Sequence, residues 1–141
     1  MVFTTNSTEQ TKEVGKTLAR EICEKYPERR FVALRGEMGV GKTAFTAGFA
    51  SYFSVDTVKS PTYTVMNEYR GTATLYHFDM YRITSEDDLY SIGYDDYIES
   101  DAYSLVEWSE NIDDFIPSNA IFVTIERCEG DERKRKITID F

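Results

Sequence analysis

The apolar positions near the start of the chain recur at helix spacing. Val14, Leu18 and Ile22 follow one another at four-residue intervals, which predicts the buried face of an amphipathic helix. Ser7 and Gln10, three residues apart just before this stripe, have the spacing of a capping box. We therefore expect the first helix to begin close to Ser7.

A strand, a glycine-rich loop and a second helix are predicted next. The apolar run at 31–34 (FVAL) has the length and composition of a buried strand, and it stops at a cluster of glycines. Phe45, Phe49 and Phe53 then recur at four-residue intervals, with alanines at 44, 47 and 50 between them. This spacing indicates a helix that buries its phenylalanine face.

The second half of the chain favours strands. A polar loop containing Pro61 precedes an extended segment at 62–69, and a helix is expected to begin at Thr84 or Ser85 and to bury Leu89 and Ile92. Residues 109–116 predict a helical turn or two, and strands are predicted at 72–82, 103–108, 120–128 and 134–141.

The order of these elements predicts the fold class. Strands that alternate with helices indicate a three-layer α/β fold around a largely parallel central sheet. The last two strands are separated only by the five residues EGDER, so we expect them to form an antiparallel hairpin at one edge. The 141 residues are enough for one domain, spanning 1–141, and too few for two.

Composition and charge restrict the functional classes. The chain is 41% hydrophobic, no apolar run reaches membrane-spanning length, and the opening MVFTTNSTEQ lacks a charged leader; we expect a cytoplasmic protein that is not bound to a membrane. Sixteen basic and twenty-five acidic residues give 16 − 25 = −9, which disfavours strong direct nucleic-acid binding by the chain alone.

The charges are unevenly distributed along the chain. Residues 83–101 hold seven acids and no base, whereas 133–136 (RKRK) form a compact basic run. Each run is either a solvated face or a contact surface for a protein partner.

The glycine-rich loop carries a phosphate-binding pattern. Gly36, four further residues, and then Gly41, Lys42 and Thr43 fit G-x-x-x-x-G-K-[ST] between a strand and a helix. Backbone amides of such a loop surround phosphate oxygens, the lysine reaches the β- and γ-phosphates, and the threonine hydroxyl binds Mg²⁺. The predicted nucleotide-binding residues of the loop are Gly36, Glu37, Met38, Gly39, Val40, Gly41, Lys42, Thr43 and Ala44.

Two acidic residues are candidates to complete the site. Asp79 ends the predicted strand LYHFD and Glu107 ends YSLVE. Phosphoryl transfer is catalysed mainly by positioning and charge neutralisation, so one acid is expected to hold Mg²⁺ while the other orients the attacking water. The residue pattern alone leaves open which acid has which role.

Five motifs in order resemble one family. GEMGVGKT at 36–43, SPTYT at 60–64, YHFDMYR at 76–82, IGYDDYI at 92–98 and LVEWSE at 105–110 are similar to the TsaE (YjeE) family. The resemblance implies a small P-loop ATPase that uses ATP and Mg²⁺, is required for the threonylcarbamoyladenosine modification of tRNA, and acts on partner proteins TsaB and TsaD. We expect slow ATP turnover by the chain alone, because 141 residues leave little material to close over the nucleotide and hold a water in line, and we expect a bound partner to raise the rate.

The resemblance also implies roles for individual residues. Glu107 becomes the Mg²⁺ partner of Thr43, and Asp79 takes the role in water orientation or hydrolysis beside Lys42. The SPTYT segment becomes a switch loop near the γ-phosphate, in which Ser60, Pro61 and Thr62 sense the nucleotide and Thr62 takes part in catalysis.

The residues assigned to the base are further from the motifs. The resemblance implies that adenine lies near the start of the first helix, where Thr8 and Thr11 are candidates, together with Arg133. Trp108 adjoins the metal glutamate, where it has either a packing or a functional role. We interpret His77, the only histidine, as a structural strand residue.

Two other functions are compatible with the same loop. One is a small-molecule or nucleotide kinase, although the chain has no clear acceptor region or arginine-rich lid. The other is a nucleotide-switched binding module with little turnover. Phosphate release, a phosphorylated acceptor or tight binding without turnover would distinguish the three.

Overall fold

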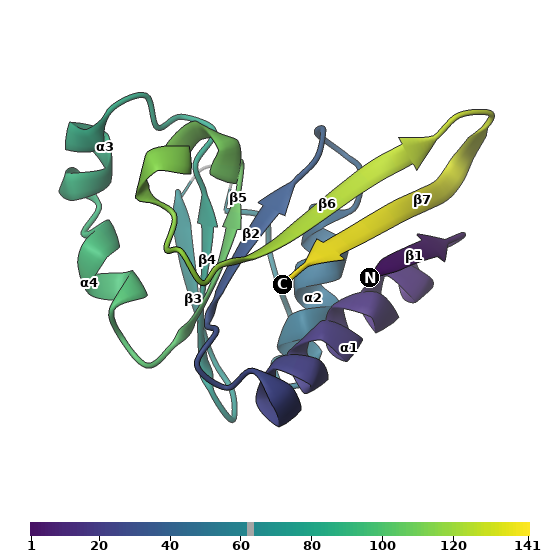
Figure 1. The fold of residues 1–141 in the computed structure, drawn as a ribbon, viewed down its shortest axis with the longest axis horizontal. Coiled ribbons are helices and arrows are strands. Elements are labelled where there is room, and N and C mark those ends of the chain that lie inside the picture. The colour runs from purple at the N-terminus through teal and green to yellow at the C-terminus, as the bar shows by residue number, and fades with distance from the viewer. Residues whose placement is uncertain (62–63) are drawn as a thin grey trace.

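The computed structural model describes residues 1–61 and 64–141. Their helices and strands are drawn in Figure 1. The strands are β1 (Val2–Thr5), β2 (Phe31–Arg35), β3 (Met66–Arg70), β4 (Thr74–Asp79), β5 (Tyr103–Glu107), β6 (Ile121–Cys128) and β7 (Asp131–Asp140). The helices are α1 (Thr8–Lys25), α2 (Lys42–Ser51), α3 (Glu86–Ser91), α4 (Tyr94–Ile98) and the 3₁₀ segment η1 (Ser109–Phe115).

The chain has an α/β fold, and its strands form one sheet with both parallel and antiparallel pairs, in the order β1-β7-β6-β2-β5-β4-β3. Strands β6, β2, β5 and β4 pair in parallel, as predicted for the centre of the sheet. The pairs β1–β7, β6–β7 and β3–β4 are antiparallel. The sheet is therefore less parallel than the sequence predicted, because each end of the parallel centre is extended by antiparallel strands.

The predicted hairpin is present but does not form the edge. Strands β6 and β7 pair antiparallel, and β1 then pairs with the outer side of β7, with Val2 opposite Thr138 and Thr5 opposite Arg135. Strand β1 was not predicted, because only Thr5 of its four residues is buried and no apolar alternation marks it. Its partner residues on β7, from Arg135 to Thr138, lie far away in the sequence and supply the hydrogen bonds that make it a strand.

Helices cover both faces of the sheet. Alternate residues of β2 point to opposite sides, so Val32 and Leu34 pack with α1 and α2 while Phe31 and Ala33 pack with the α3–α4–η1 side. Figure 1 shows α1 and α2 on one side of the sheet and α3 and α4 on the other. The result is three layers, with a hydrophobic cluster on each side of the sheet.

The predicted helix starts are confirmed. The Ser7 hydroxyl accepts a hydrogen bond from the Gln10 amide at 3.2 Å, and the Ser85 hydroxyl accepts one from the Asp88 amide at 3.2 Å. The chain after Ser85 forms two short helices instead of one, because Gly93 adopts a left-handed conformation between α3 and α4. None of the helices in the described residues is long and apolar enough to cross a membrane.

Helices α1 and α2 are in close backbone contact. A Cβ atom added to Gly48 of α2 would lie 1.8 Å from the Lys12 carbonyl oxygen of α1, a distance that no real side chain tolerates. The phenylalanine face of α2 is fully buried at Phe45 and Phe49, as its spacing predicted. This packing fixes the N-terminus of α1 relative to the N-terminus of α2.

Candidate nucleotide site

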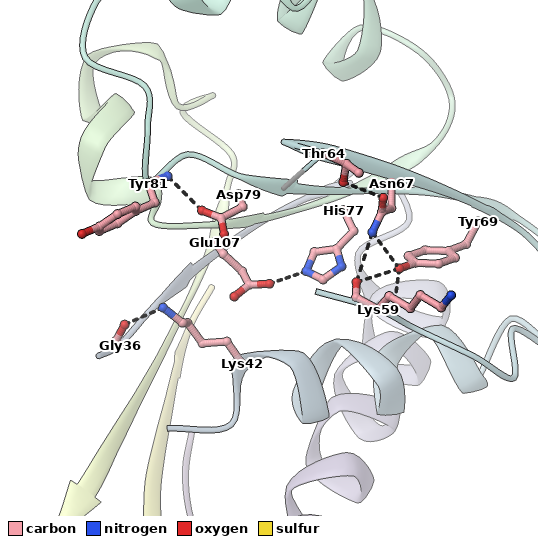
Figure 2. Close-up of polar contacts among 10 residues, drawn as sticks. All are labelled: Gly36, Lys42, Lys59, Thr64, Asn67, Tyr69, His77, Asp79, Tyr81 and Glu107. Atoms are coloured by element: carbon pink, nitrogen blue, oxygen red, sulfur yellow. Dashed lines mark hydrogen bonds and ion pairs between the residues drawn. The ribbon is translucent and has the colours of Figure 1, made fainter. Parts of the chain in front are cut away.

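The glycine-rich loop joins the carboxyl end of β2 to the start of α2. Gly41 is the N-cap of α2 and has φ = 118°, a conformation that residues with a Cβ rarely adopt. Lys42, the first residue of α2, folds back over the loop. Its Nζ donates a hydrogen bond to the Gly36 carbonyl at 2.7 Å, as Figure 2 shows, and lies 4.3 Å from the centre of the Trp108 ring.

Lys42 is a buried residue, and its ammonium is partly desolvated. The residue is only 5% exposed, and burial lowers the pKa of Lys42 although the charges of Glu107, Glu110 and Asp79 act in the opposite direction. A buried cation that has one carbonyl oxygen and one aromatic face as its described contacts is poised to accept stronger anionic partners.

The two candidate acids lie side by side. Asp79 at the end of β4 and Glu107 at the end of β5 are register partners in a parallel pair. Both are buried, at 8% and 5% exposure. Burial raises the pKa of Asp79, the hydrogen bond from the Tyr81 amide at 2.9 Å opposes this rise, and the charge of Glu107 adds to it. The two acids that were proposed from their positions at strand ends thus lie together, on the face of the sheet covered by α2.

His77 contacts the glutamate directly. It lies two residues before Asp79 on β4, on the same face of the sheet, and is wholly buried. Its Nε2 lies 2.5 Å from Glu107 Oε2 (Figure 2), and its Nδ1 has no hydrogen-bond partner within the described residues. The interpretation of His77 as a strand residue is correct, but it missed this contact; the two-residue spacing to Asp79 was the available signal.

Two cavities meet at the glycine-rich loop. The lysine-side cavity has a volume of about 380 Å³, and its lining residues are Met38, Gly39, Gly41, Lys42, Thr43, Ser60, Asp79, Tyr81, Arg82, Glu107 and Trp108. The threonine-side cavity has a volume of about 400 Å³, and its lining residues are Asn6, Ser7, Thr8, Thr11, Gly39, Val40, Gly41, Ala44, Glu132, Arg133 and Arg135. Because Gly39 and Gly41 line both, the two cavities adjoin each other at the loop.

Most of the residues predicted from the sequence line one of these cavities. Gly36 and Glu37 line a separate hollow beside β6 instead. Thr11 lines the threonine-side cavity, and its hydroxyl forms a hydrogen bond with the Thr5 hydroxyl at 2.9 Å. Pro61 is buried and lines neither cavity, and Thr62 lies outside the described residues.

Several lining residues were not predicted. Tyr81 and Arg82 follow Asp79 within the YHFDMYR motif, and their position beside the acid was the available signal. Glu132 and Arg135 reach the threonine-side cavity from β7. No sequence pattern indicates them, because their approach depends on the register of the β6–β7 hairpin.

Comparison with known proteins identifies the family of the chain. The family model "Threonylcarbamoyl adenosine biosynthesis protein TsaE" matches residues 5–137. The chain belongs to the TsaE family. Proteins of this family take part in the biosynthesis of threonylcarbamoyladenosine in tRNA, so the resemblance seen in the five motifs is confirmed.

Individual TsaE relatives cover most of the chain. The TsaE protein of Bacillus subtilis is 38% identical over 76% of this chain and 68% of its own length. That of Rickettsia bellii is 32% identical over 96% of this chain and 93% of its own. A solved structure, the crystal structure of Bacillus subtilis YdiB, superimposes with a TM-score of 0.76 at 30% identity, covering 99% of this chain and 83% of the other. The α/β architecture is therefore that of a solved relative.

Proposed function

We propose that this chain is an ATP-binding and ATP-hydrolysing protein with a P-loop NTPase fold, which drives the cycle of a TsaB–TsaD complex in threonylcarbamoyladenosine biosynthesis. The observation that carries the proposal is the pair of cavities that meet at the loop 36–41. One contains a buried lysine, a threonine and two carboxylates, which suit a triphosphate and its metal. The other contains threonines at the start of α1 and arginines of β7, which suit the nucleoside.

The loop and the lysine supply the phosphate contacts in this proposal. The backbone amides of the loop and the first amides of α2 face bound phosphate oxygens, and the N-terminal end of α2 adds its positive dipole. Lys42 exchanges its contacts with the Gly36 carbonyl and the Trp108 ring for the β- and γ-phosphates. Because Trp108 loses a cation from its ring face, its fluorescence should respond to the nucleotide.

The residues of the lysine-side cavity fit Mg²⁺. In the described part of the chain no group of three or more His, Cys, Asp or Glu side chains can hold a metal. Mg²⁺ needs no such group, since it is usually bound by one or two carboxylates, substrate phosphates and water. Thr43 and Glu107 would hold it, and its charge would act against the rise in the pKa of Asp79, which is due first to burial and then to the charge of Glu107. When bound, Mg²⁺ neutralises the charge that develops on the phosphates.

Asp79 is assigned to the attacking water. One of its oxygens, Oδ1, accepts a hydrogen bond from the Tyr81 amide. This bond fixes the carboxylate, and the remaining oxygen lone pairs are available to a water molecule. The raised pKa of Asp79 makes its carboxylate a better proton acceptor than an exposed aspartate.

Partner dependence is proposed from the charge of the chain and from the position of the switch segment at the lysine-side cavity. A net charge of −9 makes the chain a poor primary ligand for tRNA, so action through a protein partner is the simpler arrangement. The acids of α3 and α4 would meet a basic partner surface, and Ser60 lies at the lysine-side cavity, where a partner could order the switch segment.

The experiment measures phosphate release from ATP and Mg²⁺ by the purified chain, with and without its TsaB and TsaD counterparts. We expect slow release by the chain alone, faster release with both partners, and none above background for Lys42→Ala in either condition. A phosphorylated acceptor instead of free phosphate would support the kinase alternative. Parent-level turnover by Lys42→Ala would refute the site, and turnover unchanged by the partners would refute the coupled role.

A further inference from the structure

The β6–β7 hairpin contacts the outside of the glycine-rich loop through two arginines. Arg127 and Arg135 are register partners in the hairpin. Arg127 Nη2 donates to the Met38 carbonyl at 3.3 Å, and Arg135 Nε donates to the Val40 carbonyl at 2.9 Å. Arg127 Nη1 also lies 3.3 Å from a carboxylate oxygen of Glu37. The hairpin therefore binds alternate carbonyls of the loop.

These contacts determine where the loop amides point. No peptide bond in the described residues is cis, and in a planar trans peptide the C=O and the next N–H point in opposite directions. The Met38 carbonyl shares its peptide with the Gly39 N–H, and the Val40 carbonyl shares its peptide with the Gly41 N–H. With both carbonyls directed at the arginines, both amides are directed away from the hairpin.

The amides in question belong to the residues that line both cavities. Within the described part of the chain, Gly39 and Gly41 are the two residues that line both the lysine-side and the threonine-side cavity. Each peptide adjoins a glycine, whose lack of a Cβ permits rotation, so the sequence of the loop alone does not hold either amide in place. An outside contact is needed to select one orientation.

The guanidinium of Arg135 is itself held in place. Its Nη1 donates to the carbonyls of Glu132 at 2.6 Å and Lys134 at 3.0 Å, within its own strand. These bonds fix the planar group so that Nε points at Val40. An arginine whose role was to move onto a bound phosphate would not be expected to have three of its donors occupied by backbone carbonyls.

We propose that Arg127 and Arg135 are positioning residues that orient the Gly39 and Gly41 amides toward bound phosphate oxygens. The inference rests on the proposed function for the identity of the ligand. It assigns to the β6–β7 hairpin, which carries none of the five motifs, a direct part in nucleotide affinity.

The test compares variants that remove one positive charge from the hairpin. Arg127→Gln and Arg135→Gln each remove a carbonyl contact, while Lys136→Gln is the matched control because Lys136 is exposed and lies next to Arg135 on β7. Arg135→Lys keeps the charge but replaces the Nε donor. ADP affinity is measured by calorimetry, and hydrogen exchange of the 36–44 segment is measured by mass spectrometry.

We expect ADP affinity to fall about three- to tenfold in each Arg→Gln variant, the size of one net hydrogen bond. Arg135→Lys should show the same defect and Lys136→Gln less than a twofold change. Exchange of the 36–44 segment should be faster in the Arg→Gln variants without nucleotide, at an unchanged melting temperature. This exchange result tests the loop contact even if the parent binds no ADP, an outcome that would instead refute the proposed function.

Two outcomes would overturn the inference. Equal loss of affinity in Lys136→Gln and Arg135→Gln, with Arg135→Lys normal, would show a general effect of charge on an anionic ligand. Parent-level ADP affinity and parent-level exchange in both Arg→Gln variants would show that the loop holds its orientation without the hairpin.

Discussion

Replacing Lys42 with methionine should leave the free protein about as stable as the parent while removing most of its nucleotide affinity. Methionine keeps an unbranched side chain, one atom shorter than that of lysine, and removes the charge. The two effects have separate physical origins, because the contacts of Lys42 in the free protein differ from those proposed with nucleotide.

The magnitude for the free protein follows from its contacts. Lys42 has a charged hydrogen bond to the Gly36 carbonyl, worth about 1.5–3 kcal/mol, and a contact with the Trp108 ring, worth about 0.5–2 kcal/mol. Against these, burial of Lys42, a residue that is only 5% exposed, partly desolvates its ammonium at a cost of several kcal/mol. The terms nearly cancel, so we expect the free energy of unfolding to change by about 1 kcal/mol or less.

The loss of ATP affinity in the variant follows from the contacts that Lys42 exchanges on binding. Lys42 gives up the Gly36 carbonyl and the Trp108 ring and gains the β- and γ-phosphates, a net gain of one charge-assisted hydrogen bond less one cation–π contact, about 1–2 kcal/mol. Lys42→Met should therefore weaken ATP binding by a factor of about 5 to 30.

The assay is thermal unfolding with and without ATP, combined with calorimetric titration of ATP. The parent melting temperature should rise with ATP, and that of Lys42→Met should start near the parent value and rise much less. A variant that binds ATP as the parent does would refute the contact with the phosphates. A variant that melts many degrees lower without ATP would refute the cancellation argued for the free protein.

Three further predictions concern the acids and the helix contact. The pKa of Asp79 is raised in the folded protein, so its charged carboxylate destabilises the fold above that pKa. This destabilisation disappears as the pH falls toward the ordinary aspartate pKa. Asp79→Asn should therefore raise the melting temperature at pH 7 but not near pH 4. It should also bind ATP normally but not hydrolyse it, as shown by single-turnover measurement. Glu107→Gln should hydrolyse ATP slowly and recover partly at high Mg²⁺, and identical Mg²⁺ titrations for the two variants would contradict their separate roles. Gly48→Ala should lower stability by about 1–3 kcal/mol in denaturant unfolding, although alanine favours helix, because its Cβ would overlap the Lys12 carbonyl.

The elements that the sequence predicted are those whose signal is local. In each of these elements the spacing of the apolar residues indicates which positions are buried; examples are the stripe of α1, the phenylalanine face of α2 and the apolar runs of β2 and β5. The order of strand, glycine-rich loop and helix could also be predicted, because its signals lie in consecutive residues. Strand β1 and the mixed character of the sheet could not be predicted in this way, because they depend on which distant strands pair.

The same distinction applies to the candidate site. Asp79 and Glu107 could be proposed as neighbours because parallel strands bring their carboxyl ends together. The contact between His77 and Glu107 required the register of β4 against β5, which the sequence does not specify. The arginines that reach the loop carbonyls are some ninety residues from them in the chain, and nothing near the loop indicates their presence.

The backbone contact between α1 and α2 has a consequence for protein engineering. The phosphate-binding pattern occupies only the eight residues GEMGVGKT, but α2 packs against α1 at Gly48 with no room for a methyl group. A graft that moved only the loop and α2 into another scaffold would leave behind α1, the helix that carries Thr8. It would also remove the backbone contact with α1 that sets the direction of α2. The smallest transplantable unit is therefore the α1–β2–loop–α2 segment, residues 7–51, and its recipient must offer a strand pair equivalent to β6 and β7.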